Sequence, residues 1–474
     1  MYDVLVIGAG VVGGLIFREL SRYDIKVGLV EKEPDVGMGA SGANSGIVHA
    51  GFDAKPNTNK ALFNVKGAKM MESVCAELGV EYKRNGAFVI GYSDEEKEIL
   101  EDLKKRGEIN GVQSLSVIDK DELKQLIPNV SDNATCALFA KTSAIVCPYS
   151  LAIASVGNAM DNGGEFIREF EVAKVEAIDG VFNLISSDSK KVTARYVINA
   201  GGVYSDKIAS LFGDDTVKVK ARKGEYYLLD KSVAHITPYT LFTCPTEKGK
   251  GILVSQTADG NLLLGPTSEF CEKDDTSTTF SGLKEVAQKA KQMIDGIDFS
   301  NVITSFSGLR AVSDKGDFVI ERSKTCKNLF NVCGIESPGL TSSPAIAEYV
   351  ASEVAKDLNL TKKSEFNPCR KPYSLKHLSI EERNELIKKN PAYGEIVCRC
   401  ETVSLGEIED AVKRNPKAVT IDGVKHRVRA GMGRCQGGFC QSKVLDVLKK
   451  DLGVSEYEIR KKGGKSYILE RNDD

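Results

Sequence analysis

The chain has 474 residues, of which 42% are hydrophobic and 27% charged, and its 64 basic residues nearly balance 66 acidic ones. This length predicts two or three domains, and the balanced charge disfavours nucleic acid and anionic membranes as partners. No apolar run reaches the ~20 residues of a membrane helix, and the first strand begins too early to follow a signal peptide. Most of the 12 cysteines are scattered singly, so we expect a reducing, cytoplasmic location, with peripheral membrane association left open.

The first predicted element is a strand that ends in a glycine-rich turn. Residues 3–8 (DVLVIG) run into Gly8, Gly10 and Gly13, and the pattern GLIFRELSRY that follows is typical of a helix. A second strand, KVGLVEKE, ends in Glu31, 23 residues after Gly8. This order of strand, G-x-G-x-x-G, helix, strand and acid predicts dinucleotide binding. The glycines let the backbone approach a pyrophosphate at the helix N-terminus, and Glu31 is placed to bind ribose hydroxyls.

The fingerprint alone does not separate FAD from NAD, but three later segments favour a long cofactor. The segment GMGASGANSGIVHAG carries hydroxyls at Ser41 and Ser45 and suits a backbone wrapped closely around a cofactor. The strand ARYVINAGG reaches small residues at Gly201, and NLFNVCGIESPGLTSSPAIA predicts a strand, a turn and a helix that opens near Ser343-Pro344. The turn residues that we expect to contact the cofactor are Gly339, Leu340 and Thr341.

The chain resembles the D-amino-acid-oxidase superfamily of FAD enzymes in six motifs that occur in the same order: GAGVVGG, SGANSGIVHAG, VINAGG, RKGEYYLLD, SGLRAVSDKGDFVI and GIESPGLTSSPAIA. Within that superfamily it is similar to the glycerol-3-phosphate dehydrogenase and L-2-hydroxyglutarate oxidase branch, over about residues 1–365. The resemblance implies FAD and an α/β fold, with a discontinuous Rossmann-like FAD-binding domain beside a mixed-sheet α+β substrate domain. A small helical domain is expected at the C-terminus.

These expectations divide the chain into an oxidoreductase unit, a linker and a C-terminal unit. The predicted FAD-binding parts are about 1–80, 145–205 and 310–365, and the substrate domain takes about 81–144 and 206–309. Charge and prolines predict a linker over 366–392, and the C-terminal domain takes 393–474.

His49 is the candidate base. It stands in the small-residue segment expected near the flavin, and a neutral imidazole can take the proton of a substrate hydroxyl while the hydride leaves for the cofactor. The resemblance carries this role onto His49 through N-S-G-I-V-H-A-G. Two other interpretations stay open: a histidine that only satisfies backbone carbonyls, and a covalent bond to FAD, which some relatives form in this region.

Two cations are candidates for an anionic substrate. Arg310, in SFSGLRAVSD, follows a glycine and precedes a predicted turn at the domain junction, and its planar fork suits a phosphate or carboxylate. Relatives use the arginine of this motif in that way, although a structural ion pair is the alternative. Lys250, in GKGILVSQT, matches a lysine that helps to hold phosphate in glycerol-3-phosphate oxidases, with Lys248 as a competitor. The hydroxyls of Ser337 and Thr341 suit substrate, flavin or the turn itself.

Four cysteines near the C-terminus form two short-range pairs. Cys398 and Cys400 are separated by one residue, and Cys435 and Cys440 follow after thirty-four more. Four thiolates in this pattern indicate tetrahedral zinc or an iron–sulfur cluster. Between and after the pairs, SLGEIEDAVKRNP and QSKVLDVLKKDLG predict two amphipathic helices, the first starting near Ser404.

The pattern C-R-C-E-T with G-R-C-Q-G-G-F-C resembles the [2Fe–2S] domain of bacterioferritin-associated ferredoxin, in the form fused to some flavoenzymes. The resemblance implies a [2Fe–2S] cluster with these four cysteines as ligands, and zinc stays the alternative. The basic run VKHRVRAGMGR between the pairs is interpreted as a solvated face, with docking of an acidic electron acceptor as the second reading.

The resulting hypothesis is a FAD-dependent dehydrogenase. It would oxidise sn-glycerol 3-phosphate to dihydroxyacetone phosphate and send electrons through the cluster to a protein, a quinone or a partner flavoprotein subunit. L-2-hydroxyglutarate, another hydroxy or amino acid, or an opine is the alternative substrate. The alternative from another class is a zinc-stapled binding subunit without catalysis.

Overall fold

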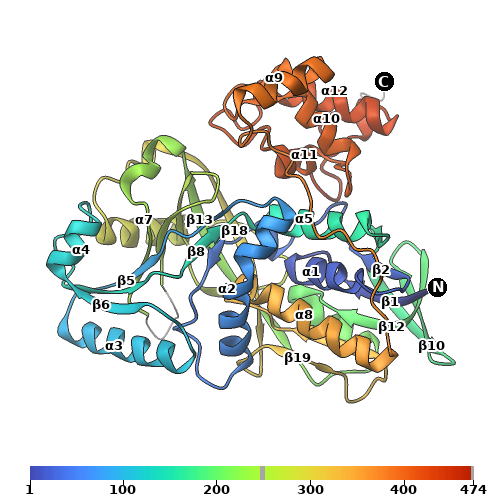
Figure 1. Cartoon of the computed structure of the whole chain (residues 1–474), viewed down its shortest axis with the longest axis horizontal. Helices are drawn as coiled ribbons and strands as arrows, with labels where there is room; N and C mark the ends of the chain where they lie inside the picture. The colour runs from blue at the N-terminus through green and yellow to red at the C-terminus, as the bar shows by residue number, and fades with distance from the viewer. Residues whose placement is uncertain (246–250, 471–474) are drawn as a thin grey trace.

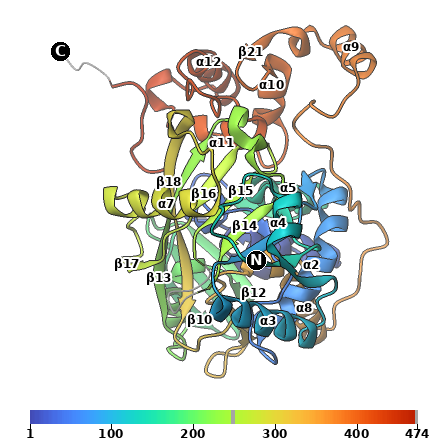
Figure 2. The same ribbon diagram turned by 90° about the vertical axis from the view of Figure 1, so that its left-hand side faces the viewer.

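The computed structural model describes residues 1–245 and 251–470. Two large sheets lie side by side, and a helical module, built from the C-terminal residues, sits on one edge of the pair (Figure 1). In the turned view of Figure 2, this module again lies above the rest of the molecule. Lys248 and Lys250 lie outside the described residues.

The first sheet contains the predicted dinucleotide fold. Its core is parallel: β1 lies between β12 and β2, and β20 continues the sheet beyond β12. The eight strands are β1 (Tyr2–Ile7), β2 (Val27–Val30), β9 (Glu165–Ile167), β10 (Val172–Ile178), β11 (Val181–Ser186), β12 (Lys191–Asn199), β19 (Val319–Arg322) and β20 (Leu329–Cys333). Because the carboxyl ends of β1, β2 and β12 share an edge, the loops after them meet there.

Helices cover both faces of this sheet. The helices packed together on one face, around a core that includes Phe17 and Ile346, are α1 (Val11–Leu20), α2 (Asn59–Leu78), α5 (Pro148–Asp161) and α8 (Gly339–Leu358). On the other face a second apolar cluster surrounds Phe170 and Leu184, next to α6 (Ser205–Leu211).

The second sheet is mixed, as expected for the substrate domain. Its nine strands are β5 (Ala87–Gly91), β6 (Leu115–Asp119), β7 (Cys136–Ala140), β13 (Val219–Leu229), β14 (Thr240–Thr243), β15 (Leu253–Gln256), β16 (Leu262–Gly265), β17 (Glu269–Cys271) and β18 (Val302–Ser313). Helices α3 (Asp94–Ile109), α4 (Lys120–Leu126) and α7 (Phe280–Met293) pack against it. Strand β18 pairs with β13 as far as Ser313, so Arg310 lies inside a strand, and the predicted turn follows the end of that strand at 314–317.

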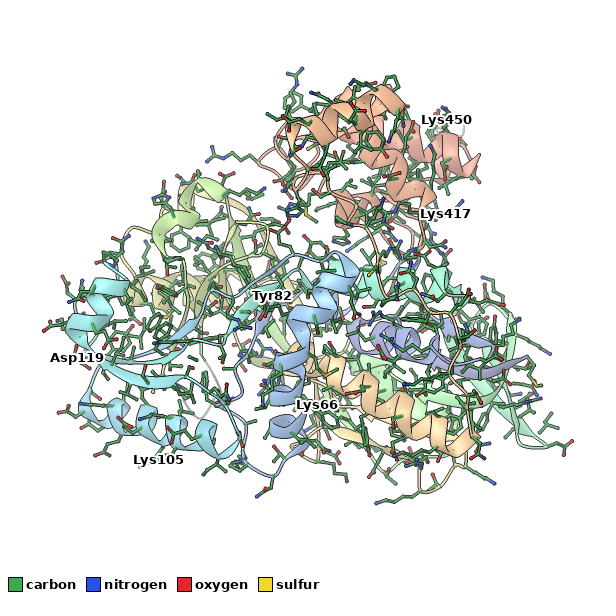
Figure 3. The ribbon with its side chains drawn as sticks, in the orientation of Figure 1. Lys66, Tyr82, Lys105, Asp119, Lys417 and Lys450 are labelled. Carbon is green, nitrogen blue, oxygen red and sulfur yellow. The ribbon has the colours of Figure 1, made fainter. Side chains whose placement is uncertain are left out.

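Short elements join the two halves. Strands β3 (Ile47–Val48), β4 (Tyr82–Lys83) and β8 (Ala144–Val146) form a small sheet, and β3 leads directly into His49. In Figure 3, Lys66 on α2 and the labelled Tyr82 lie between the two large halves. The chain therefore leaves the small sheet at His49, between the first and the second large sheet.

Helix α8 begins four residues before the predicted opening near Ser343-Pro344. Proline lacks an N–H and its ring crowds the carbonyl four residues earlier, which is that of Leu340. Here the Ser343 hydroxyl donates to the Leu340 carbonyl at 2.7 Å, so the helix continues through Pro344 from Gly339.

The C-terminal module is more helical than expected. It contains β21 (Ile396–Cys398), β22 (Val403–Ser404), α10 (Leu405–Lys413), α11 (Ile421–Val428) and α12 (Gln441–Leu452). Helices α10 and α12 match the two predicted helices, and Ser404 caps α10. Helix α11 was not predicted, and α9 (Ile380–Lys389) lies inside the predicted linker. A reciprocal capping box between Ser379 and Glu382 explains α9.

Within the two described ranges, no helix has both the length and the apolar character needed to cross a membrane.

Candidate active site

A cavity of about 1080 Å³ runs between the two large sheets. The predicted site residues that line it are Gly8, Gly10, Gly13, Glu31, Ser41, Ser45, His49, Gly201, Arg310, Gly339 and Leu340. Thr341 is fully buried directly behind them. The fold therefore brings residues between Gly8 and Leu340 into the wall of one cavity, which includes the glycine-rich turn, His49 and Arg310.

The dinucleotide end of the cavity is made largely of backbone. A Cβ at Gly13 would lie 1.9 Å from the Gly8 carbonyl oxygen, so only glycine lets α1 approach β1 this closely. The Val11 N–H donates to the Ser41 hydroxyl at 2.9 Å. Other first-turn N–H groups of α1 have no partner within the helix, and Val12 lines the cavity. This end fits a pyrophosphate.

Glu31 closes the same end. Its carboxylate accepts the N–H groups of Ala9 at 2.7 Å and Glu33 at 3.0 Å. Burial raises the pKa of Glu31, and these two hydrogen bonds offset part of that rise. The side chain still borders the cavity, so it can accept further hydrogen bonds from a ribose, as the sequence predicted.

His49 is held by its backbone and leaves its ring at the cavity. Its N–H donates to the Thr341 hydroxyl at 2.9 Å, and the Asn64 amide donates to its carbonyl at 2.7 Å. The ring nitrogen Nε2 lies 3.4 Å from the Ser337 Oγ. Because the Thr341 hydroxyl also contacts the Ile47 carbonyl, it ties β3 to α8.

Arg310 faces the same part of the cavity from β18. Its Nη2 donates to the Thr267 carbonyl at 2.8 Å. Burial raises the pKa of Tyr226, and the neighbouring Arg310 lowers it in part. Within residues 1–245 and 251–470, no carboxylate forms an ion pair with Arg310, so its charge is directed to the cavity. The alternative of a structural ion pair is therefore not what the structure shows.

Three charged cavity residues that were not predicted contact one another. Glu336, whose side chain is 8% exposed, pairs with Lys60 at 2.7 Å and with Arg222. Arg222 is the direct cross-strand neighbour of Arg310. The motif GIESPG contained the acid and RKGEYYLLD the arginine, but nothing in either stretch indicated that the two meet.

The four cysteines of the C-terminal module pair across the two motifs. Cys400 and Cys435 place their sulfurs 3.7 Å apart, and Cys440 interacts with Cys398. Among the described residues, no group of three or more Cys, His, Asp or Glu side chains gathers around one metal position. Two pairs of thiols match a [2Fe–2S] cluster, in which two irons share four cysteines.

The loop that carries Cys435 is shaped for a thiolate. A Cβ at Gly433 would lie 2.3 Å from that of Cys400, so glycine permits the two motifs to meet. Burial raises the pKa of the Cys435 thiol, but the N–H groups of Gly437, Phe439 and Gly438 outweigh it and the pKa is lowered. Backbone donors of this kind tune a metal-bound sulfur.

Most of the basic run VKHRVRAGMGR is buried or half-buried, although Arg434 near its end is 63% exposed. Arg427 and Arg429 are 5% and 9% exposed, and both contact the oxidoreductase half. The interpretation as a solvated face is therefore wrong. A charge run is usually exposed because burying a cation requires a partner for it, and here carboxylates far away in the sequence supply the partners.

Comparison with known proteins agrees with this geometry. The family described as FAD dependent oxidoreductase matches residues 3–353. The chain belongs to this family. The protein is accordingly a FAD-dependent enzyme, and the lining of the described cavity fits that cofactor. A second family, described as BFD-like [2Fe-2S] binding domain, matches residues 396–450, which include all four cysteines. The module therefore binds a [2Fe–2S] cluster rather than zinc.

Relatives of this FAD-dependent oxidoreductase are named for two substrates, glycerol 3-phosphate and L-2-hydroxyglutarate. It is 44% identical to a glycerol 3-phosphate dehydrogenase of Caloramator mitchellensis over 99% of this chain and 98% of the relative. It is 33% identical to a glycerol 3-phosphate oxidase of Mycoplasma genitalium, over 77% of this chain and 97% of the relative. An L-2-hydroxyglutarate dehydrogenase of Pongo abelii is 28% identical over 76% of this chain and 88% of its own.

A solved structure is also similar. The dithionite-reduced L-alpha-glycerophosphate oxidase of Mycoplasma pneumoniae, with FAD bound, superposes with a TM-score of 0.74 at 29% identity, over 78% of this chain and 98% of its own. That share corresponds to the oxidoreductase unit and leaves room for the C-terminal module.

Proposed function

We propose that the protein oxidises sn-glycerol 3-phosphate to dihydroxyacetone phosphate and passes the electrons through its [2Fe–2S] cluster to a further acceptor. The observation that carries the proposal is a cavity lined by His49, Ser337 and Arg310, in which the His49 ring lies 3.4 Å from the Ser337 hydroxyl. Similarity to the Caloramator mitchellensis glycerol 3-phosphate dehydrogenase over nearly the whole of both chains supports the choice of substrate.

His49 is the proposed base. When bound, FAD supplies the acceptor for the hydride. The Thr341 and Asn64 contacts hold the His49 backbone, so the ring approaches a bound hydroxyl in a fixed orientation. Its Nε2 then takes the hydroxyl proton, and Ser337, 3.4 Å away, is placed to orient the same hydroxyl.

Arg310 is the proposed anchor for the phosphate. Its guanidinium is fixed through the Thr267 carbonyl, and a planar fork binds phosphate in two-point fashion. Glu336 pairs with the adjacent Arg222 and Lys60, whereas Arg310 has no carboxylate partner among the described residues, so we assign the phosphate to Arg310. Lys250 keeps its predicted role as a second phosphate ligand.

An anaerobic substrate screen tests the proposal. Glycerol 3-phosphate should bleach the flavin and yield dihydroxyacetone phosphate, and the EPR signal of the reduced cluster should follow. Bleaching by L-2-hydroxyglutarate but not by glycerol 3-phosphate would transfer the proposal to the dicarboxylate. Bleaching without any cluster signal would remove the cluster from the electron path. Acid precipitation should release the flavin, whereas retained flavin would indicate a covalent bond to His49.

A further inference from the structure

Arg427 joins the C-terminal module to the FAD-binding half through a buried ion pair. Its Nη1 and Nη2 donate to the two Asp35 carboxylate oxygens at 2.6 and 2.8 Å, and the side chains are 0% and 4% exposed. Nε and Nη2 donate to the Pro416 carbonyl at 3.0 and 2.7 Å, and Nη1 donates to the Gly423 carbonyl at 2.7 Å. All five guanidinium N–H groups are thus paired.

Asp35 belongs to the turn of residues 33–38, which follows Glu31 and forms part of the cavity wall. Glu33 before it and Met38 after it line that cavity, and the N–H of Glu33 donates to the Glu31 carboxylate. The Gly37 N–H donates to the Ala9 carbonyl in the glycine-rich turn at 3.0 Å. One face of this turn therefore shapes the cofactor site, and the other face holds Arg427.

Arg429 anchors the module to the substrate half. It pairs with Asp259 at 2.7 Å and donates to Asn261 at 2.9 Å, both in the hairpin between β15 and β16. It also pairs with Glu401 of its own module at 2.8 Å. Since the cysteine loop follows within a few residues, the end of α11 fixes that loop against both halves. In Figure 3, Lys417 lies on the side of the module that faces the rest of the chain, and Lys450 lies farther away from it.

We infer that Arg427 is a positioning residue whose ion pair with Asp35 couples docking of the [2Fe–2S] module to binding of FAD. Undocking would break this two-point, charge-assisted contact between the module and the 33–38 turn. A docked module holds the 33–38 turn in the form that walls the cavity, and FAD holds the same turn from inside. By linkage, each event strengthens the other by the same factor. The inference does not depend on the substrate.

The first test measures FAD affinity in the full-length chain. Flavin is removed and retitrated by fluorescence in the wild type, Arg427→Gln and Arg460→Gln. Arg427→Gln should weaken FAD by about 5- to 150-fold. Arg460 is the matched control because its 2.7 Å pair with Glu169 also links the module to the first half but is 21% and 43% exposed. Surface pairs contribute little, so its affinity should change by less than about twofold.

The second test measures amide hydrogen exchange in 416–429 with and without FAD. In the wild type FAD should slow this exchange although these residues lie outside the cavity, and in Arg427→Gln and Asp35→Asn the slowing should vanish. Asp35→Asn leaves the Pro416 and Gly423 bonds of Arg427 in place, so retained iron and sulfide show that the module stays folded. If Arg427→Gln loses its iron, its module has unfolded, and the FAD affinity and hydrogen exchange of Asp35→Asn then test the inference. Unchanged FAD affinity, or FAD-dependent slowing that persists in Asp35→Asn, would overturn the inference.

Discussion

The FAD cavity takes its wall from segments spread between Ile7 and Leu340, whereas the cluster takes four thiols from 398–440. At its dinucleotide end the cavity relies on backbone groups and on the absence of side chains. The cluster relies on four cysteine side chains, which the glycines and backbone N–H groups around Cys435 support. We therefore expect the FAD site to tolerate most truncations but not an added methyl group, and the cluster site to fail when one sulfur is lost.

Loss of one thiol should separate the two sites most clearly. In Cys398→Ser, iron and sulfide should fall from about two atoms each per chain to nearly none, because Cys398 is buried beside Cys440. Flavin content and flavin bleaching by substrate should persist. The exposed Cys369 is the control, and Cys369→Ser should keep both cofactors. Iron analysis measures the cluster content and absorbance spectra measure the flavin content. An iron content in Cys398→Ser equal to that of the wild type would refute the assignment of Cys398 as a ligand.

Removal of the base should affect the chemistry and leave both cofactors bound. His49→Ala should lower kcat by about 10²- to 10⁴-fold, the usual contribution of a positioned base. Anaerobic single-turnover bleaching measures this step directly. His235→Ala provides the comparison, because this histidine contacts the Ser232 carbonyl at the surface. A small loss in His49→Ala would favour amine oxidation, which needs no strong base.

An added methyl group tests the opposite property of the dinucleotide end. Gly13→Ala places a Cβ 1.9 Å from the Gly8 carbonyl. Relief of such overlap costs about 1–3 kcal/mol, so FAD should bind about 5- to 150-fold more weakly. Nothing lies within 4 Å of a Cβ at Gly39, also in the cavity wall. Equal FAD dissociation constants in Gly13→Ala and Gly39→Ala would contradict the proposed packing.

The weakest expected effect concerns the contact between the two regions. Burial lowers the pKa of His426 to about 4, and its ring lies 5.0 Å from that of Tyr149. A histidine with a depressed folded pKa favours unfolding once pH falls below its unfolded value near 6.5. Stability of the module should therefore drop by about 1 kcal/mol by pH 5.5. Thermal unfolding of the wild type and His426→Gln checks this, and equal pH slopes would contradict it.

Local sequence predicted the elements whose signals lie within a few residues. The strand, glycine turn, helix and acid around Gly8 and Glu31 are all present, and Ser404 caps α10 as expected. Helix α9 was missed although its capping box was readable at Ser379 and Glu382, because charge and prolines outweighed it. The opening of α8 was misplaced because a hydroxyl compensates for Pro344.

The sequence by itself determined the two cofactor motifs, because a glycine turn and cysteine spacing act through neighbouring residues. It also indicated His49 as the candidate base and Arg310 as the candidate ligand of an anionic substrate. Only the tertiary structure decided that Glu336 pairs with Arg222 and Lys60, and that Arg427 and Arg429 of the basic run bind Asp35 and Asp259. Partners separated by more than one hundred residues leave no local pattern, since burial and charge pairing arise only when the chain has folded.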